Sequence, residues 1–261
     1  MTDAREFSRR TALSLLGGAA AALALPGASA LAAPLAWQQR WAPVPSRDGL
    51  GAFEGVEDDR ANSHPGAKHI YPQGDTYRFD MHKRDRDTST DRQRNEVRGM
   101  RSGGASVDLF QGQTWRFTYS MYIPSSLKAT TSFTHIMQTK MPGLGSAPVT
   151  VMSLRRRGSR STIEFKVTEG DVLVGDVDLA PLQNKWIDTE VEIKVGNGNG
   201  SVRWVVREGG RTVIDARKSN VDTWLDDRLR PKWGIYRSLN DSANINDTYL
   251  LLRNLKAYQQ V

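Results

Sequence analysis

Cysteine is absent from this chain of 261 residues. Disulfide scaffolds, cysteine-ligated metal centres, iron–sulfur clusters and thiol nucleophiles are therefore excluded. Histidine is scarce, with only 4 residues, namely His64, His69, His82 and His135, so a histidine-rich metal site has few possible ligands. The composition is 38% hydrophobic and 25% charged, which is typical of a globular chain and not of a disordered one.

Positive charge is what the chain has in excess. Lys and Arg number 36 against 29 for Asp and Glu, which gives a net charge of +7. A basic surface indicates an anionic partner, such as a polyuronate, a sulfated glycan, a nucleic acid or a membrane. The length allows one large domain or two small ones.

The first 32 residues have the pattern of an export signal. A twin-arginine pair, Arg9-Arg10, precedes an apolar run from Leu13 to Leu25, and a cleavage-type site follows at Ala30-Leu31-Ala32. The apolar run is shorter than the ~20 residues that a permanent membrane helix needs. We expect residues 1–32 to be a twin-arginine signal peptide, removed on export to the periplasm or the medium, and not a buried helix. The mature chain then has no membrane attachment.

The remaining sequence predicts short β-strands. Apolar and polar residues alternate over 114–123, 162–167 and 190–195, which is the period of a strand with one buried face. Gly196-Asn197-Gly198-Asn199-Gly200 predicts a tight hairpin, because glycine and asparagine tolerate positive φ. Strands at regular spacing with no long amphipathic helix predict an all-β, two-sheet antiparallel sandwich or jelly roll, formed as one domain over residues 33–261.

The first strand that can carry chemistry runs from Arg92 to Arg98. With a period of two, Arg92, Arg94, Glu96 and Arg98 project from one face. Three guanidiniums with one carboxylate to orient them suit bidentate contacts with carboxylates. The alternative is a solvated charged strand.

The second such strand is Thr134–Lys140. Gln138 and Lys140 share one face, where an amide beside an ammonium can hold a carboxylate, while His135 and Met137 share the other. The alternative is an ordinary strand whose histidine packs in the core.

The third is Lys232-Trp233-Gly234-Ile235-Tyr236. Lys232, Gly234 and Tyr236 lie on one face, and the glycine leaves room for a ligand to approach the backbone. A lysine close to a tyrosine favours the phenolate and lowers the tyrosine pKa from ~10. The alternative is a core strand with an amphipathic tyrosine.

Taken together, the three strands resemble the jelly-roll polysaccharide lyases, the group that contains alginate, glucuronan and heparin-I-type lyases. Alginate lyases have an R-x-E-x-R strand, a Q-x-H strand and a K-x-G-x-Y strand in that order, and the corresponding segments here are Arg94–Arg98, Gln138–Lys140 and Lys232–Tyr236. Two departures from the pattern matter: Lys140 replaces the histidine, and Arg237-Ser238 follow the tyrosine where alginate lyases have Asn-Gln. The first difference argues against a histidine base at that position, and the second against alginate as the substrate.

The resemblance implies a concanavalin-like jelly roll with a concave substrate groove, and cleavage of a uronate-containing anionic polysaccharide by β-elimination. In that scheme Arg94 and Gln138 neutralise the uronate carboxylate and Tyr236 is the acid, or both acid and base. Arg92, Arg98, Lys140 and Lys232 hold neighbouring uronates, and Glu96 orients the arginines. His135 joins the catalytic residues if a β-bulge turns it into the groove with Gln138. Without a histidine base, Tyr236 alone predicts syn elimination, and therefore chains of glucuronate or mannuronate.

Other expectations and alternatives stay open. A non-catalytic glycan-binding module has the same sandwich and basic groove, and a jelly-roll glycoside hydrolase needs two carboxylates across the scissile bond. Nucleic acid is not expected as a partner of an exported chain, and we expect a monomer. The elimination requires no metal or organic cofactor. A structural calcium ion at Asp241, Asn244, Asn246 and Asp247 is one alternative to an ordinary turn.

Overall fold

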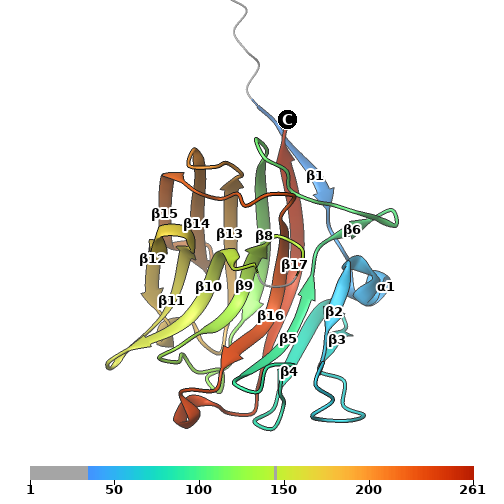
Figure 1. Ribbon diagram of the computed structural model, residues 1–261, viewed down its shortest axis with the longest axis vertical. Coiled ribbons are helices and arrows are strands. Elements are labelled where there is room, and N and C mark those ends of the chain that lie inside the picture. The colour runs from blue at the N-terminus through green and yellow to red at the C-terminus, as the bar shows by residue number, and fades with distance from the viewer. Residues whose placement is uncertain (1–34, 144–145) are drawn as a thin grey trace, which may run out of the picture. The chain divides into compact units, whose positions relative to one another are not determined.

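The computed structural model describes residues 35–143 and 146–261, and the predicted signal peptide lies outside the described residues. Two large antiparallel sheets pack face to face as a sandwich (Figure 1). This confirms the predicted all-β jelly roll. No helix in the described part of the chain is long and apolar enough to cross a membrane.

The seven-stranded sheet contains all three of the strands that carry the predicted site residues. In spatial order it consists of β12 (Val172–Asp178), β11 (Arg160–Val167), β10 (Pro148–Arg157), β9 (Thr134–Lys140), β16 (Arg230–Ser238), β5 (Arg92–Arg98) and β2 (Gly55–Glu57). In Figure 1 this sheet faces the viewer, with β9, β16 and β5 side by side at its centre. We call its face away from the sandwich interior the outer face.

The second sheet has eight strands. In spatial order these are β15 (Arg211–Val221), β14 (Gly200–Glu208), β13 (Trp186–Lys194), β8 (Thr114–Tyr122), β17 (Thr248–Gln260), β4 (Thr76–Met81) and β3 (Ile70–Gln73), with β1 (Trp37–Trp41) paired to β17. The smaller elements are β6 (Arg101–Ser102), β7 (Ala105–Ser106), one short helix α1 (Pro45–Asp48) and four 3₁₀ turns, η1 (Gly49–Ala52), η2 (Glu169–Asp171), η3 (Ala180–Leu182) and η4 (Ser242–Asn244).

The core lies between the sheets and fixes which side chains face outward. The five apolar residues that alternate over 114–123 are all buried, as the pattern predicts. On β16, Trp233 stacks on Trp41 with ring centroids 5.5 Å apart and meets Phe117 of the opposite sheet at 6.1 Å. Because neighbouring side chains alternate across a strand, burial of Trp233 and Ile235 turns Lys232 and Tyr236 to the outer face.

Candidate active site

Strands β9, β16 and β5 bring the predicted site residues into register. Tyr236 of β16 lies opposite Arg94 of β5 on one side and opposite His135 of β9 on the other. Four residues earlier, Lys232 pairs with Gln138 in the same way. Motifs that are about 40 to 140 residues apart in the chain therefore meet on one face of one sheet.

A cavity of about 560 Å³ opens on this outer face. Among the described residues that line it, seven side chains are cationic and one, Glu57, is a carboxylate. Six of the predicted residues belong to this lining, namely Arg92, Arg94, Arg98, Lys140, Lys232 and Tyr236. Such an excess of positive charge in a concave site favours a polyanionic ligand.

Two guanidinium groups flank Tyr236. Arg92 Nη1 donates a hydrogen bond of 2.8 Å to the Tyr236 hydroxyl, and Arg94 lies over the tyrosine ring with its guanidinium carbon 3.6 Å from the centroid. Both cations stabilise negative charge on a phenolate oxygen. The cations at Tyr236 are therefore these two arginines and not Lys232, which the sequence suggested for that position.

Lys232 instead lies at the centre of a buried ion network beneath the cavity. Its ammonium donates to Glu57 Oε2 at 2.7 Å and to Glu96 Oε2 at 2.8 Å, and its side chain is only 3% exposed. Burial by itself raises the pKa of Glu57, but Lys232, Arg94 and Arg60 outweigh it and lower that pKa to about 2. Lys232 thus holds two carboxylates together and has little surface left for a substrate.

Gln138 and Glu96 complete this network. Gln138 Nε2 donates to Glu96 Oε1 at 2.6 Å, and both side chains are buried. Glu96 therefore accepts from Gln138, Lys232 and Arg94 at once, and it orients Arg94 as the sequence suggested. The amide nitrogen of Gln138 is bound to Glu96, whereas the sequence suggested that it would hold the substrate carboxylate.

Arg94 has a more exposed side chain than Glu57, Glu96 or Lys232 in this network. Its guanidinium donates to Asp87 Oδ2 at 3.0 Å and to Glu96 Oε2 at 3.0 Å, while 13% of the side chain stays exposed. Burial lowers the pKa of Arg94, but Glu96, Glu57 and Tyr236 raise it by more. The pKa of Arg94 therefore lies above its ordinary value. Arg94 therefore carries its charge at every relevant pH.

The β-bulge on which a role for His135 depends is present. Pairing of β9 with β10 slips by one residue between Met137 and His135, and pairing with β16 slips at the same level. The bulge places the His135 ring 5.8 Å from the Tyr236 ring, and Phe133 stacks against both rings. Burial, with Arg94, Arg155 and Lys232 nearby, lowers the pKa of His135 to about 3, so the imidazole is neutral. Its Nδ1 lies 2.6 Å from Ser153 Oγ.

The remaining predicted residues line the edges of the cavity. Lys140 is half-buried and donates to the backbone and hydroxyl oxygens of Ser146; burial, Lys232, Arg94 and Arg230 lower its pKa. Arg98 pairs with Glu57 Oε1 at 3.2 Å. Arg98 and Arg92 are partly exposed, and they are the more accessible cations.

The proposed calcium ligands have other partners. Asp241 accepts from Thr131 N, from Arg156 and from Asn244, and Asp247 accepts from Lys83 N. Asn246 is bound through its backbone carbonyl to Arg237. These contacts belong to a turn that fastens neighbouring loops.

Sequence patterns missed several members of the site. Glu57 comes from the three-residue strand β2, and Arg60 and Asp87 come from irregular segments. Arg60 Nη2 binds Asp87 Oδ1 at 2.5 Å, which links those segments below Arg94. No alternation marks these residues, and of the three only Asp87 lies in the segment of dense mixed charge over 83–101.

Comparison with known proteins finds similarity in structure alone. No protein-family model matches the chain, and no curated protein sequence matches it. Among solved structures, a family 7 alginate lyase in complex with substrate has a TM-score of 0.56 at 15% identity, covering 85% of this chain and 97% of that one. An alginate lyase from Pseudomonas aeruginosa has a TM-score of 0.52 at 14% identity, covering 80% and 98%.

A third match is a marine alginate lyase from Zobellia galactanivorans, with a TM-score of 0.50 at 12% identity and coverage of 85% and 94%. Each match extends over nearly the whole of the solved chain. At this level of identity such matches establish architecture and do not identify a substrate. This chain therefore has the β-jelly-roll fold of the alginate lyases.

Proposed function

We propose that this protein is a polysaccharide lyase that cleaves a uronate-containing anionic polysaccharide by β-elimination. The position of Tyr236 carries the proposal. Its hydroxyl is bound by Arg92 in a cavity whose described lining contains seven cationic side chains. An elimination needs a group that moves protons beside cations that hold the uronate carboxylate, and this cavity supplies both.

Neutralisation of the carboxylate is the first chemical requirement. The proton at C5 of a uronate becomes acidic enough to remove only when the negative charge developing on the neighbouring carboxylate is stabilised. Arg94 suits that role because it is permanently charged and held by Asp87 and Glu96. We assign Gln138 to holding Glu96, and through it Arg94, in place.

Proton transfer is the second requirement, and we assign it to Tyr236. As a phenolate, Tyr236 takes the C5 proton, and as a phenol it protonates the departing C4 oxygen. Arg92 and Arg94 stabilise the phenolate that takes the first proton and that the second transfer restores. No metal or organic cofactor takes part in this scheme.

A glycoside hydrolase is the weaker alternative. Hydrolysis uses two carboxyl groups that flank the scissile bond. Among the described cavity residues Glu57 is the one carboxylate, and both Glu57 and Glu96 are tied to Lys232. Neither is placed to protonate a leaving group on one side while the other acts opposite.

The arrangement around Tyr236 also favours syn over anti elimination. Anti elimination needs two groups on opposite sides of the sugar, but His135 lies directly beside Tyr236, with ring centroids 5.8 Å apart. Lys140 has the lowered pKa of a partly buried amine, but in our scheme it is a cation that holds a neighbouring uronate and not the base. We therefore propose syn elimination by Tyr236, with glucuronate- or mannuronate-containing chains as substrates.

Incubation with polyglucuronate, polymannuronate and polyguluronate tests the proposal. We expect ultraviolet absorbance from unsaturated uronate ends with the first or second polymer and little with the third. New reducing ends without that absorbance would indicate hydrolysis, and binding without either product would indicate a glycan-binding module. A preference for polyguluronate that is lost in His135→Gln would refute syn elimination.

Export by the twin-arginine route, followed by action as a monomer in the periplasm or medium, is also part of the proposal. The Arg9-Arg10 pair supports it. Replacing both arginines by lysine should retain an uncleaved precursor inside the cell, as detected by fractionation and mass spectrometry. Cleavage and export that continue unchanged would contradict this assignment.

A further inference from the structure

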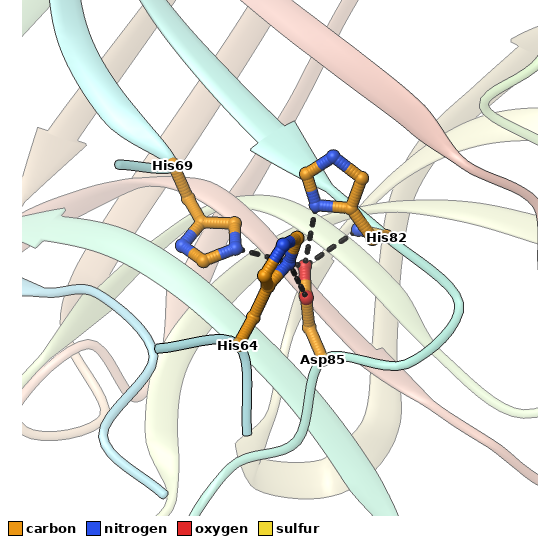
Figure 2. Close-up of side chains that lie close together, drawn as sticks. All are labelled: His64, His69, His82 and Asp85. Carbon is orange, nitrogen blue, oxygen red and sulfur yellow. Dashed lines mark hydrogen bonds and ion pairs between the residues drawn. The ribbon is translucent and has the colours of Figure 1, made fainter. Parts of the chain in front are cut away.

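Three of the four histidines gather around one aspartate, away from the catalytic cavity. Figure 2 shows His64, His69 and His82 converging on the carboxylate of Asp85. His69 precedes β3, His82 follows β4, and His64 and Asp85 come from the adjoining loops. We propose that these four residues bind a divalent transition metal ion, with zinc as the metal that fits their chemistry.

The distances from the histidine nitrogens to the Asp85 carboxylate oxygens are close to those between two ligand atoms of a tetrahedral metal ion. His64 Nδ1 lies 3.1 Å from Asp85 Oδ1, and His82 Nδ1 and His69 Nε2 lie 3.2 and 3.3 Å from Asp85 Oδ2. One ligand atom from each residue lies within 4.8 Å of all the others. Tetrahedral zinc with bonds of about 2.0–2.1 Å separates its ligand atoms by about 3.3 Å, so closure needs small side-chain movements.

The partners of the two ring nitrogens of His69 provide the second argument. Its Nδ1 lies 2.6 Å from Asp58 Oδ1, while Nε2 is buried, has no hydrogen-bond partner and points at Asp85. A neutral imidazole has one N–H. When Nδ1 donates that N–H to Asp58, the lone pair of Nε2 faces a carboxylate oxygen of Asp85. A cation between Nε2 and Asp85 relieves the repulsion between them. Carboxylate–histidine–metal arrangements have this geometry.

Buried contacts hold the ligands in position independently of any ion. The backbone N–H of His82 donates to Asp85 Oδ2 at 2.6 Å. Gln93 Nε2 donates to the carbonyl oxygens of His82 and Asp85, both at 2.8 Å, and Arg237 Nε donates to Gln93 Oε1 at 2.7 Å. Gln93 and Arg237 are fully buried. A supporting shell of this kind is what a defined metal site requires.

The ligand set selects the metal and its role. Three imidazoles and one carboxylate suit zinc and its neighbours, whereas calcium and magnesium prefer oxygen ligands. Four protein ligands close a tetrahedral site, which is typical of a structural metal. The side chain of His82 is 36% exposed and gives the ion access from solvent. Asp87, two residues beyond Asp85, binds Arg60 and Arg94, so the metal would fasten one wall of the catalytic cavity.

Metal content and thermal stability test the inference on the full mature chain, purified without a histidine tag. Elemental analysis should find about one zinc per chain. Removal of the metal by a chelator should lower Tm by about 10 °C, and zinc but not calcium or magnesium should restore it. Cobalt(II) added to the metal-free protein should give the visible absorption of tetrahedral coordination.

Matched variants locate the site. His69→Gln and Asp85→Asn should lose the metal, whereas His135→Gln, which removes the one histidine outside the cluster, should keep it. If His69→Gln fails to fold, His82→Gln at the exposed rim should fold and bind zinc at least about 100-fold more weakly. Wild-type protein that contains less than a tenth of an equivalent after growth with zinc, and whose Tm does not respond to zinc, would overturn the inference. These measurements involve no polysaccharide, so they stand or fall separately from the proposed lyase activity.

Discussion

At the scale of single residues, Tyr236 has contacts that suit proton transfer better than substrate docking. Its hydroxyl accepts a hydrogen bond from Arg92, and its ring packs between Arg94 and Phe133. Among the described residues lining the cavity it is the one tyrosine. In the proposed mechanism the ring and the hydroxyl therefore have separable roles, because the ring makes the packing contacts and the hydroxyl would transfer the protons.

Tyr236→Phe should abolish turnover and leave binding nearly intact. We expect kcat to fall at least about 100-fold, the range for loss of a general acid or base, while the affinity for substrate changes less than about threefold. Steady-state kinetics and calorimetric titration with oligosaccharide measure the two effects. Tyr258→Phe on β17, in the opposite sheet, is the control. A variant that binds poorly but turns over normally at saturation would make Tyr236 a docking residue.

Lys232→Met should destabilise the fold, because it removes the buried ammonium that binds both Glu57 and Glu96 and leaves them with Arg94 as their shared cation. We expect the free energy of unfolding to fall by about 3–5 kcal/mol at pH 7. The control is Lys185→Met, which breaks a more exposed pair with Glu208 and should cost less than about 1 kcal/mol. A loss for Lys232→Met as small as that of the control would contradict the network.

The stability difference between wild type and Lys232→Met should also depend on pH. The pKa of Glu57 lies at about 2 in the folded chain against 4.5 ordinarily, so its ionisation stabilises the fold above pH 4.5. That contribution is lost as pH falls from 4.5 toward 2. The difference in Tm between wild type and Lys232→Met should therefore shrink over this window. A difference that stays constant down to pH 2 would show that Lys232 does not hold Glu57 ionised.

At the scale of elements, the geometry of the site depends on how β16 passes between β5 and β9. Gly234 has φ of +138° and lies where the pairing with β9 slips. A Cβ at this position would lie 2.2 Å from Asn95 O and 2.8 Å from Glu96 Cα. Glycine therefore lets β16 approach β5 closely while Lys232 and Tyr236 stay on the outer face.

Gly234→Ala should lower both stability and activity. The new Cβ would meet the β5 backbone, which cannot move aside as a flexible side chain can, in a backbone conformation that favours glycine. We expect a loss of at least about 2 kcal/mol by denaturant unfolding and a larger relative loss in kcat than in affinity. Gly51→Ala, which has open space around it, is the control. Equal stability of the two variants would show that β16 accommodates the methyl group.

Strand patterns predicted these elements well because burial of one face imposes a period of two. The alternation over 114–123 and the outward positions of Arg94 and Tyr236 could be predicted in this way. A strict period of two along β9 predicts that His135 and Gln138 lie on opposite faces. The β-bulge that breaks this period could be named from the sequence as a possibility but not predicted from it. The ion partners of Lys232 and the convergence of His64, His69 and His82 depend on how irregular loops close in space, which no local period encodes.

At the scale of the whole molecule, the two sheets differ in what their exposed faces offer. The outer face of the seven-stranded sheet concentrates cations around the cavity, with one carboxylate in its described lining. On the eight-stranded sheet, cations are interspersed with acids, as where Arg203 pairs with Asp215, Glu190 and Glu192. The cavity lining is therefore the region that gives a polyanion a preferred side of approach.

Salt should therefore weaken substrate binding more than catalysis. Between about 0.02 and 0.5 M ionic strength the Debye length falls several-fold, and we expect KM for a polyuronate to rise about tenfold while kcat changes less than about twofold. Arg98→Gln removes a partly exposed cavity cation and should raise KM at low salt and flatten its salt dependence. Arg217→Gln, exposed on β15 of the opposite sheet, should leave the salt dependence unchanged. A KM independent of salt, or an equal effect of the two substitutions, would mean that the polymer is not held by the charge of this cavity.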